Sequence, residues 1–129
     1  MRHPRDYTVN EAWIVFRLND APIRTEQDGD FHVVCLMDAA SCFVLGNEFF
    51  ATGSTEVPAP VAEVLIETGR AAANVLPRKL LLSSALGAGQ FENLAERSGI
   101  EVERVPDKEL TAFLSEVRKG FRKQIAQRP

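Results

Sequence analysis

The residues with the clearest potential for chemistry form one short loop, Ser83-Ser84-Ala85-Leu86-Gly87-Ala88-Gly89-Gln90. It follows an apolar run and precedes a helical segment, the usual place for a ligand in an open α/β sheet. Its backbone N–H groups can cradle an anion, with Ser83, Ser84, Gly87 and Gly89 as candidate ligand-binding residues. The loop lacks the Lys of a P-loop and the glycine spacing of a dinucleotide site. A flexible loop with a Ser cap is the favoured interpretation, and a small-anion or nucleotide site is the alternative.

Other nucleophilic and metal-ligating residues are few and scattered. His3 and His32 are the only histidines, and Cys35 and Cys42 are the only cysteines. They do not have the spacing of a zinc site, and no Ser lies in a nucleophile-elbow pattern. A hairpin that placed the cysteines across from each other would permit a disulfide, but two buried thiols in a reducing cytoplasm are the simpler expectation. We therefore expect no metal and no cofactor.

Composition indicates an ordinary globular protein. The chain has 129 residues, of which 45% are hydrophobic and 26% charged, and its formal net charge is -3. This length fits a single domain over residues 1–129, with a polar, loosely held segment at 1–10. The mild negative charge argues against a nucleic-acid surface, and no apolar run reaches the roughly 20 residues that span a bilayer. Without a secretory signal, we expect a cytoplasmic location and no membrane partner.

Three apolar segments in the first half of the chain predict strands. Residues 13–18 are almost continuously apolar, as a strand covered on both faces should be. Residues 31–37 and 42–46 are joined by the tight connection Asp38-Ala39-Ala40-Ser41, whose carboxylate can accept backbone hydrogen bonds. So short a connection predicts an antiparallel hairpin. Residues 51–59 are expected to form a loop.

The second half of the chain alternates helices and strands. The predicted elements are a helix that begins at Pro60 and ends before Pro77, a buried strand at 80–82, a helix at 90–98, an edge strand at 100–105 and a final helix capped by Asp107. The buried stripe of the first helix is expected to be Val61, Val64, Leu65, Thr68, Ala72, Val75 and Leu76. That of the last helix is expected to be Leu110, Phe113, Leu114, Val117, Phe121 and Ile125.

The order of these elements restricts the topology. An initial meander packs as 3-2-1, and two right-handed helical crossovers then place the fourth strand beside the first and the fifth outside it. We expect an α/β fold with a five-stranded mixed sheet of order 3-2-1-4-5. The second strand should be antiparallel to its neighbours, and helices should cover both faces.

This order and spacing resemble the RNase H-like catalytic core of transposases and retroviral-type integrases, over about residues 11–125. The segment Met37–Val44 resembles their second hairpin, and Leu94–Ile100 resembles the helix-to-strand passage before their last acid. The pattern is also similar to small uncharacterised bacterial proteins with an early Trp and an Asp–Ser hairpin. The resemblance implies an RNase H-like three-layer fold.

The resemblance further implies divalent cations held between carboxylates, and here the sequence departs from it. The first acid belongs where Phe16-Arg17 stands, and the second where Ser83-Ser84 stands. Only Glu109 or Glu116 can fill the third position. One carboxylate is a poor magnesium site, so metal-dependent nuclease or integrase activity is not expected.

The C-terminal end is basic, with Arg118, Lys119, Arg122, Lys123 and Arg128. These cations are interpreted as complements to the negative end of the helix dipole, with a phosphate-backbone surface as the alternative. The charge of the whole chain favours the first interpretation.

The third strand carries few charges and is expected at a sheet edge, where unpaired backbone groups invite partners. Phe49 and Phe50 are the candidate interface residues, unless the first helix and the following loop cover both rings. We expect a non-catalytic RNase H-like module that acts through protein–protein contacts, as a homo-oligomer or with an unknown protein partner. An enzyme or anion binder that uses the Ser83–Gly89 loop is the alternative.

Overall fold

The computed structural model describes residues 2–19, 21–24, 26 and 29–126, and in this part of the chain five strands form one mixed sheet. The strands are β1 (Ala12–Arg17), β2 (Phe31–Asp38), β3 (Val44–Ala51), β4 (Lys79–Ser83) and β5 (Glu101–Val105). The helices are α1 (Ala59–Ala73), α2 (Gly89–Ser98) and α3 (Thr111–Ala126), and the 3-10 turns are η1 (Pro4–Asp6) and η2 (Asp107–Glu109). The side chain of Ile125 and all of Arg128 lie outside the described residues.

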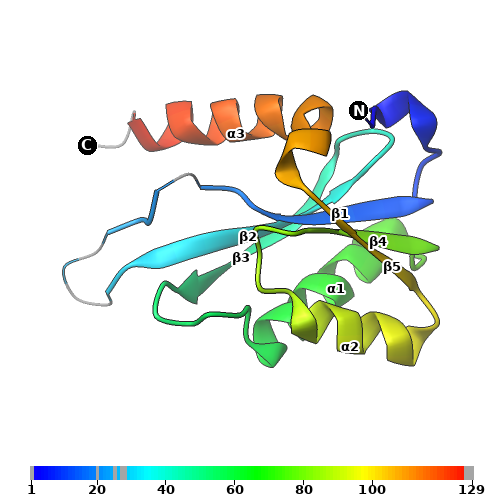
Figure 1. Cartoon of the computed structure of the whole chain (residues 1–129), viewed down its shortest axis with the longest axis horizontal. Helices are drawn as coiled ribbons and strands as arrows, with labels where there is room; N and C mark the ends of the chain where they lie inside the picture. The colour runs from blue at the N-terminus through cyan, green and yellow to red at the C-terminus, as the bar shows by residue number, and fades with distance from the viewer. Residues whose placement is uncertain (1, 20, 25, 27–28, 127–129) are drawn as a thin grey trace.

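The sheet has the order β3-β2-β1-β4-β5, which confirms the predicted topology. β2 is antiparallel to both β1 and β3, whereas β4 is parallel to β1 and β5. Helix α3 lies on one face, and α1 and α2 lie on the other (Figure 1). None of the helices in the described residues has the length and apolar character needed to cross a membrane.

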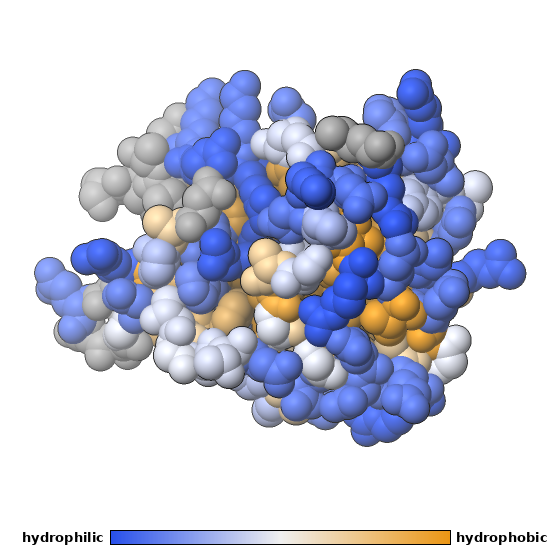
Figure 2. Space-filling view, viewed as in Figure 1, coloured by the Kyte–Doolittle hydropathy of each residue, from blue (hydrophilic) through white to orange (hydrophobic). Residues whose placement is uncertain are grey.

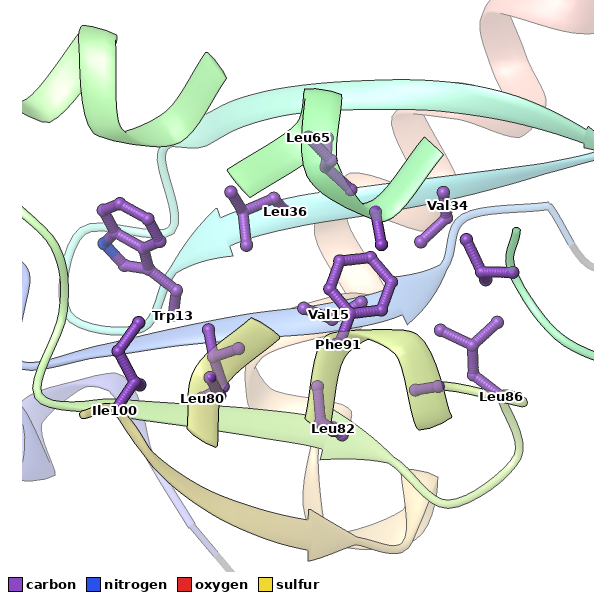
Figure 3. Close-up of a cluster of buried hydrophobic side chains, with 14 of the residues drawn as sticks. Trp13, Val15, Val34, Leu36, Leu65, Leu80, Leu82, Leu86, Phe91 and Ile100 are labelled. Atoms are coloured by element: carbon purple, nitrogen blue, oxygen red, sulfur yellow. The ribbon is translucent and has the colours of Figure 1, made fainter. Parts of the chain in front are cut away.

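The core lies on both faces of the central strand β1, because all its residues from Ala12 to Phe16 are fully buried. Trp13 and Val15 point toward α1 and α2, where they meet apolar side chains of β2, β4 and both helices (Figure 3). Ile14 and Phe16 point the other way, into a cluster that includes Phe113 of α3. The predicted coverage of this strand on both faces is therefore confirmed.

Helix α1 is rotated relative to the prediction. Its buried residues are Ala62, Leu65 and Gly69, while Val64 remains exposed at 50%. The helix also ends earlier than predicted, at Ala73 with Asn74 as a left-handed C-cap, so Val75 and Leu76 lie beyond it. The cause of the rotation is a close approach to the sheet, since a Cβ at residue 69 would lie 2.6 Å from Cδ2 of Leu36. Only a glycine lets the helix sit this near, and that contact determines which stripe faces inward.

The hairpin also differs from the prediction. β3 begins at Val44 and continues to Ala51, so the predicted strand at 42–46 was placed too early and the loop begins later. Cys42 belongs to the turn, with a left-handed φ of 57°. The expected Asp38 cap is present, because its Oδ2 accepts from the Ser41 backbone N–H at 2.9 Å. The register shifts opposite Leu36 and Met37, which leaves Leu45 as a bulge residue in β3.

Two further expectations concern the cysteines and Asp107. Cys35 and Cys42 are free thiols, and burial raises the pKa of the Cys35 thiol to about 12, as expected of a buried cysteine. The prediction that Asp107 caps the last helix is wrong. Asp107 lies in η2, and α3 begins after it at Thr111.

The N-terminal segment, for which composition predicts loose attachment, contacts the body of the protein. Arg2 forms an ion pair with Glu103 of β5 and donates to the Tyr7 hydroxyl at 3.2 Å. The Tyr7 ring lies 6.0 Å from that of Phe113. The hydrogen bond from Arg2 lowers the pKa of Glu103. The resulting stabilisation is present at neutral pH and is lost as the pH falls through that lowered pKa.

The contact at Gly69 can be tested by substitution. Gly69→Val should destabilise the protein by roughly 1–3 kcal/mol, the usual cost of overpacking a core. Gly120→Ala is the matched control, because Gly120 is exposed in α3 and a methyl group added there would have nothing within 4 Å. This control should gain about 0.5–1 kcal/mol, since alanine is favoured over glycine within a helix. Urea unfolding measures both, and unchanged stability of Gly69→Val would contradict the close approach.

Candidate functional site

The parallel strands β1, β4 and β5 have their carboxyl ends at the same end of the sheet. The resemblance would place metal-binding acids at this end, on the side that α3 covers. Phe16 at this end of β1 is fully buried. The guanidinium carbon of Arg118, from α3, lies 5.6 Å from the centre of the Phe16 ring. A cation therefore covers an aromatic ring at the first of these positions, in a favourable cation–π geometry.

The same arginine joins three segments of the chain. Its Nη2 donates to Oδ2 of Asp107 at 3.1 Å, and its Nε and Nη2 donate to the backbone carbonyl of Arg17 at 3.1 and 2.7 Å. The other carboxylate oxygen of Asp107 accepts a hydrogen bond from the hydroxyl of Ser83. Ser83 is 1% exposed, so its hydroxyl needs this partner. The Arg118–Asp107–Ser83 cluster thus ties α3 and η2 to the ends of β1 and β4.

These residues do not fit a divalent cation. A magnesium or manganese site needs free carboxylate oxygens, whereas Asp107 already binds a guanidinium and a hydroxyl. The two remaining candidate acids do not join Asp107 in a shared site. A carboxylate oxygen of Glu109 lies 3.7 Å from Nε of Arg2, and Glu116 is exposed on α3. Among the described residues, no three His, Cys, Asp or Glu side chains gather as metal ligands do. The chemistry of the donor set argues against a metal-dependent reaction here.

Sequence reasoning anticipated Ser83 at this position but missed its two partners. Asp107 was interpreted as a helix cap, and Arg118 as part of a solvated basic end. Arg118 is instead largely buried, with its side chain 19% exposed. The available signal was the apolar surroundings of Arg118, which follows Val117 in the inward stripe of α3. A charged residue beside such a stripe often has a buried partner.

The Ser83–Gly89 loop is closed by the chain itself. The backbone N–H of Gly89, at the start of α2, donates to Oε1 of Glu56 at 3.2 Å. The backbone N–H of Val57 donates to the carbonyl of Gly87 at 2.9 Å. A Cβ at Gly87 would lie 2.3 Å from the carbonyl oxygen of Thr55, so this glycine permits close packing of two loops.

The proposed anion cradle is therefore occupied by an internal carboxylate. Glu56 supplies the negative charge that the N-terminus of α2 favours. Ser83 points to Asp107, and Ser84 is exposed while its backbone N–H bonds to the carbonyl of Val105 at 2.9 Å. The loop holds the four candidate ligand-binding residues near one another, but their contacts are internal. The interpretation as a β–α loop fits these bonds, but the expected Ser cap is wrong, because the N-cap of α2 is Ala88, whose side chain makes no capping hydrogen bond.

The two candidate interface residues point in opposite directions, because β3 continues through both and side chains alternate along a strand. Phe50 is 7% exposed and belongs to the core beside α1. Phe49 is 57% exposed on the α3 face, where its ring packs edge-on against Phe31 at 6.3 Å. The expectation for Phe50 is thus corrected, and of the two rings only that of Phe49 is exposed to solvent.

Phe49 forms one wall of an apolar groove between β3 and the C-terminal half of α3. The groove has a volume of about 570 Å³. Its walls include Val44, Asn47 and Phe49 from β3, and Val117 and Phe121 from α3. These residues leave an apolar hollow beside the last strand of the sheet.

Comparison with known proteins bears on the fold. The chain matches no protein-family model and no curated protein. It is similar in structure to a chain of the simian T-cell lymphotropic virus intasome, solved in complex with the PP2A regulatory subunit B56 gamma. The TM-score is 0.58 at 13% sequence identity, covering 89% of this chain and 39% of that one. The present chain spans about two fifths of the matched chain's length (39%).

The fold is RNase H-like. The sheet order of this chain and the structural similarity over 89% of its length support this assignment, and identity this low carries nothing about activity. The RNase H-like scaffold holds an arginine–aspartate–serine cluster at the ends of its central strands, beside the buried ring of Phe16.

The cluster should contribute to stability. Arg118→Met keeps an apolar stem over Phe16 but removes the donors to Asp107 and Arg17. We expect a loss of about 1–3 kcal/mol, the usual cost of leaving such groups unpaired. Lys119→Met, at the exposed neighbouring position, should stay within about 0.5 kcal/mol of the wild type. Chemical denaturation compares the two, and equal stabilities would show that the cluster is not an internal clamp.

The same geometry predicts no magnesium- or manganese-dependent cleavage of DNA, RNA or hybrid duplexes. The reason is chemical, because the first two acid positions hold Phe16 and Ser83 and the nearby Asp107 is already paired. End-labelled duplexes incubated with each metal provide the measurement. Cleavage that disappears on Glu109→Ala, Glu116→Ala or Asp107→Ala would overturn this prediction.

Proposed function

We propose that this chain is a non-catalytic RNase H-like module that acts through protein–protein contacts, with self-association along β3 as its main form. The observation that carries the proposal is a difference between the two edges of the sheet. Most residues of the edge strand β5 are charged, whereas the other edge strand, β3, has one charged residue and an exposed aromatic side chain.

The guarded edge is β5, where three of five residues are charged: Glu101, Glu103 and Arg104. Arg2 and Lys79 pair with Glu103, the latter at 3.3 Å, and Arg104 pairs with Glu92. The face seen in Figure 2 is mostly hydrophilic, with hydrophobic residues showing near its centre and toward its right. Charges of this kind discourage the addition of a further strand.

The open edge is β3, which is the last strand of the sheet and has eight residues. Its sequence contains one charged residue, Glu48, and no Lys or Pro. Phe49 is 57% exposed on this strand, and aromatic side chains are enriched where protein interfaces form. Unpaired backbone donors and acceptors beside an exposed ring favour a partner strand.

The alternative function, an anion or nucleotide site at the Ser83–Gly89 loop, requires a ligand to displace the Glu56 carboxylate from Gly89. No contact in the described loop favours that exchange, since Gly87 and Ser83 also have internal partners. Protein contact at β3 is therefore the function that the geometry supports best.

Sedimentation velocity over a wide concentration range tests the proposal. The wild type should associate reversibly and weakly, because a strand-edge contact belongs to the small interface class. Phe49→Ser should raise the dissociation constant about tenfold or more, the effect of losing an interface anchor worth at least about 1.4 kcal/mol.

Ala85→Ser is the control, since Ala85 is exposed in the loop after β4, on the β5 side of the sheet and away from β3. It should leave association unchanged. A wild type that stays monomeric at the highest concentration would refute self-association.

A further inference from the structure

Helix α1 has a second apolar stripe that the monomer leaves uncovered. It consists of Val64, Thr68 and Ala72 in the helix and of Val75 just beyond the C-cap at Asn74, and we call it the outer stripe. Val64 and Val75 are 50% and 47% exposed, and Thr68 and Ala72 are also exposed. Val64, Thr68 and Ala72 recur every four residues, so they share one side of the helix.

The outer stripe lies on the β3 side of α1. A Cβ at Gly46 in β3 would lie 3.0 Å from Cγ2 of Thr68, whereas Gly69 faces Trp13 and Leu36, further into the sheet. The other flank of α1 contacts α2. The outer stripe therefore lies over β3, the edge strand whose outward-facing backbone groups have no partner strand in the sheet.

From these two features we infer that a second copy of the chain docks by a two-fold axis through Asn47, pairing β3 with β3 and packing the two outer stripes together. This inference rests on the proposed self-association and specifies its geometry. An isologous contact is self-limiting, whereas pairing of β3 with the charged β5 edge would give an open filament.

The register follows from the faces of β3. Directly opposite residues of an antiparallel pair must point to the same face. The two-fold axis must therefore lie midway between one residue and the same residue of the second copy, and we name the axis by that residue. An axis at Glu48 would set two carboxylates against each other, which is unfavourable. An axis at Asn47 instead pairs two amides, each able to donate to the other's carbonyl oxygen.

The bulge at Leu45 makes the rest of this register match. With the axis at Asn47, Phe49 of the second copy lies opposite Val44, since the bulge residues Leu45 and Gly46 together oppose Glu48. Val44 and Phe49 both line the groove beside α3. Each Phe49 ring thus covers the exposed end of the neighbouring copy's groove.

Helix α1 selects the same axis independently. Thr68 is central in the outer stripe and lies over Gly46, and Leu45 lies near Ala72 and Ala73 at the later end of the helix. An axis at Asn47 therefore sets the middle of one stripe against the middle of the other, with Val64 near the second copy's Val75. An axis at Phe49 would displace the stripes toward the start of α1 and leave Val75 uncovered.

Cysteine cross-linking tests the register. Asn47→Cys, Glu48→Cys and Phe49→Cys are each made with Cys42→Ser and oxidised with copper–phenanthroline. Opposed residues have Cα atoms about 4.5–5.5 Å apart, within the range for a disulfide. Asn47→Cys should therefore give a covalent dimer. Two Phe49→Cys residues would lie roughly 13 Å apart along the strands, from a rise of about 3.4 Å per residue, and should not.

The outcomes separate this inference from the function on which it rests. A dimer by sedimentation that cross-links through Glu48→Cys or Phe49→Cys rather than Asn47→Cys, or through none of the three, would refute the axis at Asn47 while leaving self-association intact. A monomer by sedimentation would refute both. Val64→Gln should raise the dissociation constant about tenfold, and Glu63→Gln, on the same helix outside the outer stripe, should not change it. An unaffected Val64→Gln dimer would remove α1 from the interface.

Discussion

The whole arrangement depends on a central strand that cannot be left open on either face. β1 is apolar from Ala12 to Phe16, and all of these residues are fully buried. Burying both faces of one strand requires a layer on each side. Helices α1 and α2 supply one layer, and α3 supplies the other. The buried apolar area of this strand thus links the sheet order to the helix positions, and it places the candidate site where β1 ends.

At that end the molecule has a clamp rather than a reactive centre. Arg118 satisfies a strand carbonyl and a carboxylate at once, and its guanidinium lies over Phe16. Such a group fixes the relative positions of α3, η2 and two strands. The Ser83–Gly89 loop is fixed in a similar way by Glu56 from another loop. Both places where α/β proteins commonly bind ligands are closed by internal charges.

Much of the fold was predictable because it depends on local patterns. The apolar runs, the turn at Asp38 and the alternation of helices and strands after it indicated the element order, and the order restricted the topology. The rotation of α1 was not predictable, since the helix has two apolar stripes and the choice depends on the approach of Gly69 to Leu36. The clamp was missed for a similar reason, because Ser83, Asp107 and Arg118 are far apart in sequence and no local pattern joins them. The boundary of β3 was misplaced because a bulge at Leu45 interrupts its alternation.

The Arg118–Asp107–Ser83 clamp also prevents any single substitution from creating a carboxylate metal site at these strand ends. An aspartate at position 16 would be created beneath the Arg118 guanidinium, and an acid at position 83 would be created beside Asp107. A carboxylate at position 16 would pair with Arg118, whereas one at position 83 would lie against Asp107, so that two carboxylates would repel each other beside a single guanidinium. A carboxylate site at these strand ends is therefore separated from the present chain by at least two coordinated substitutions. The surface over β3 and α1, by contrast, can change one residue at a time without disturbing the core.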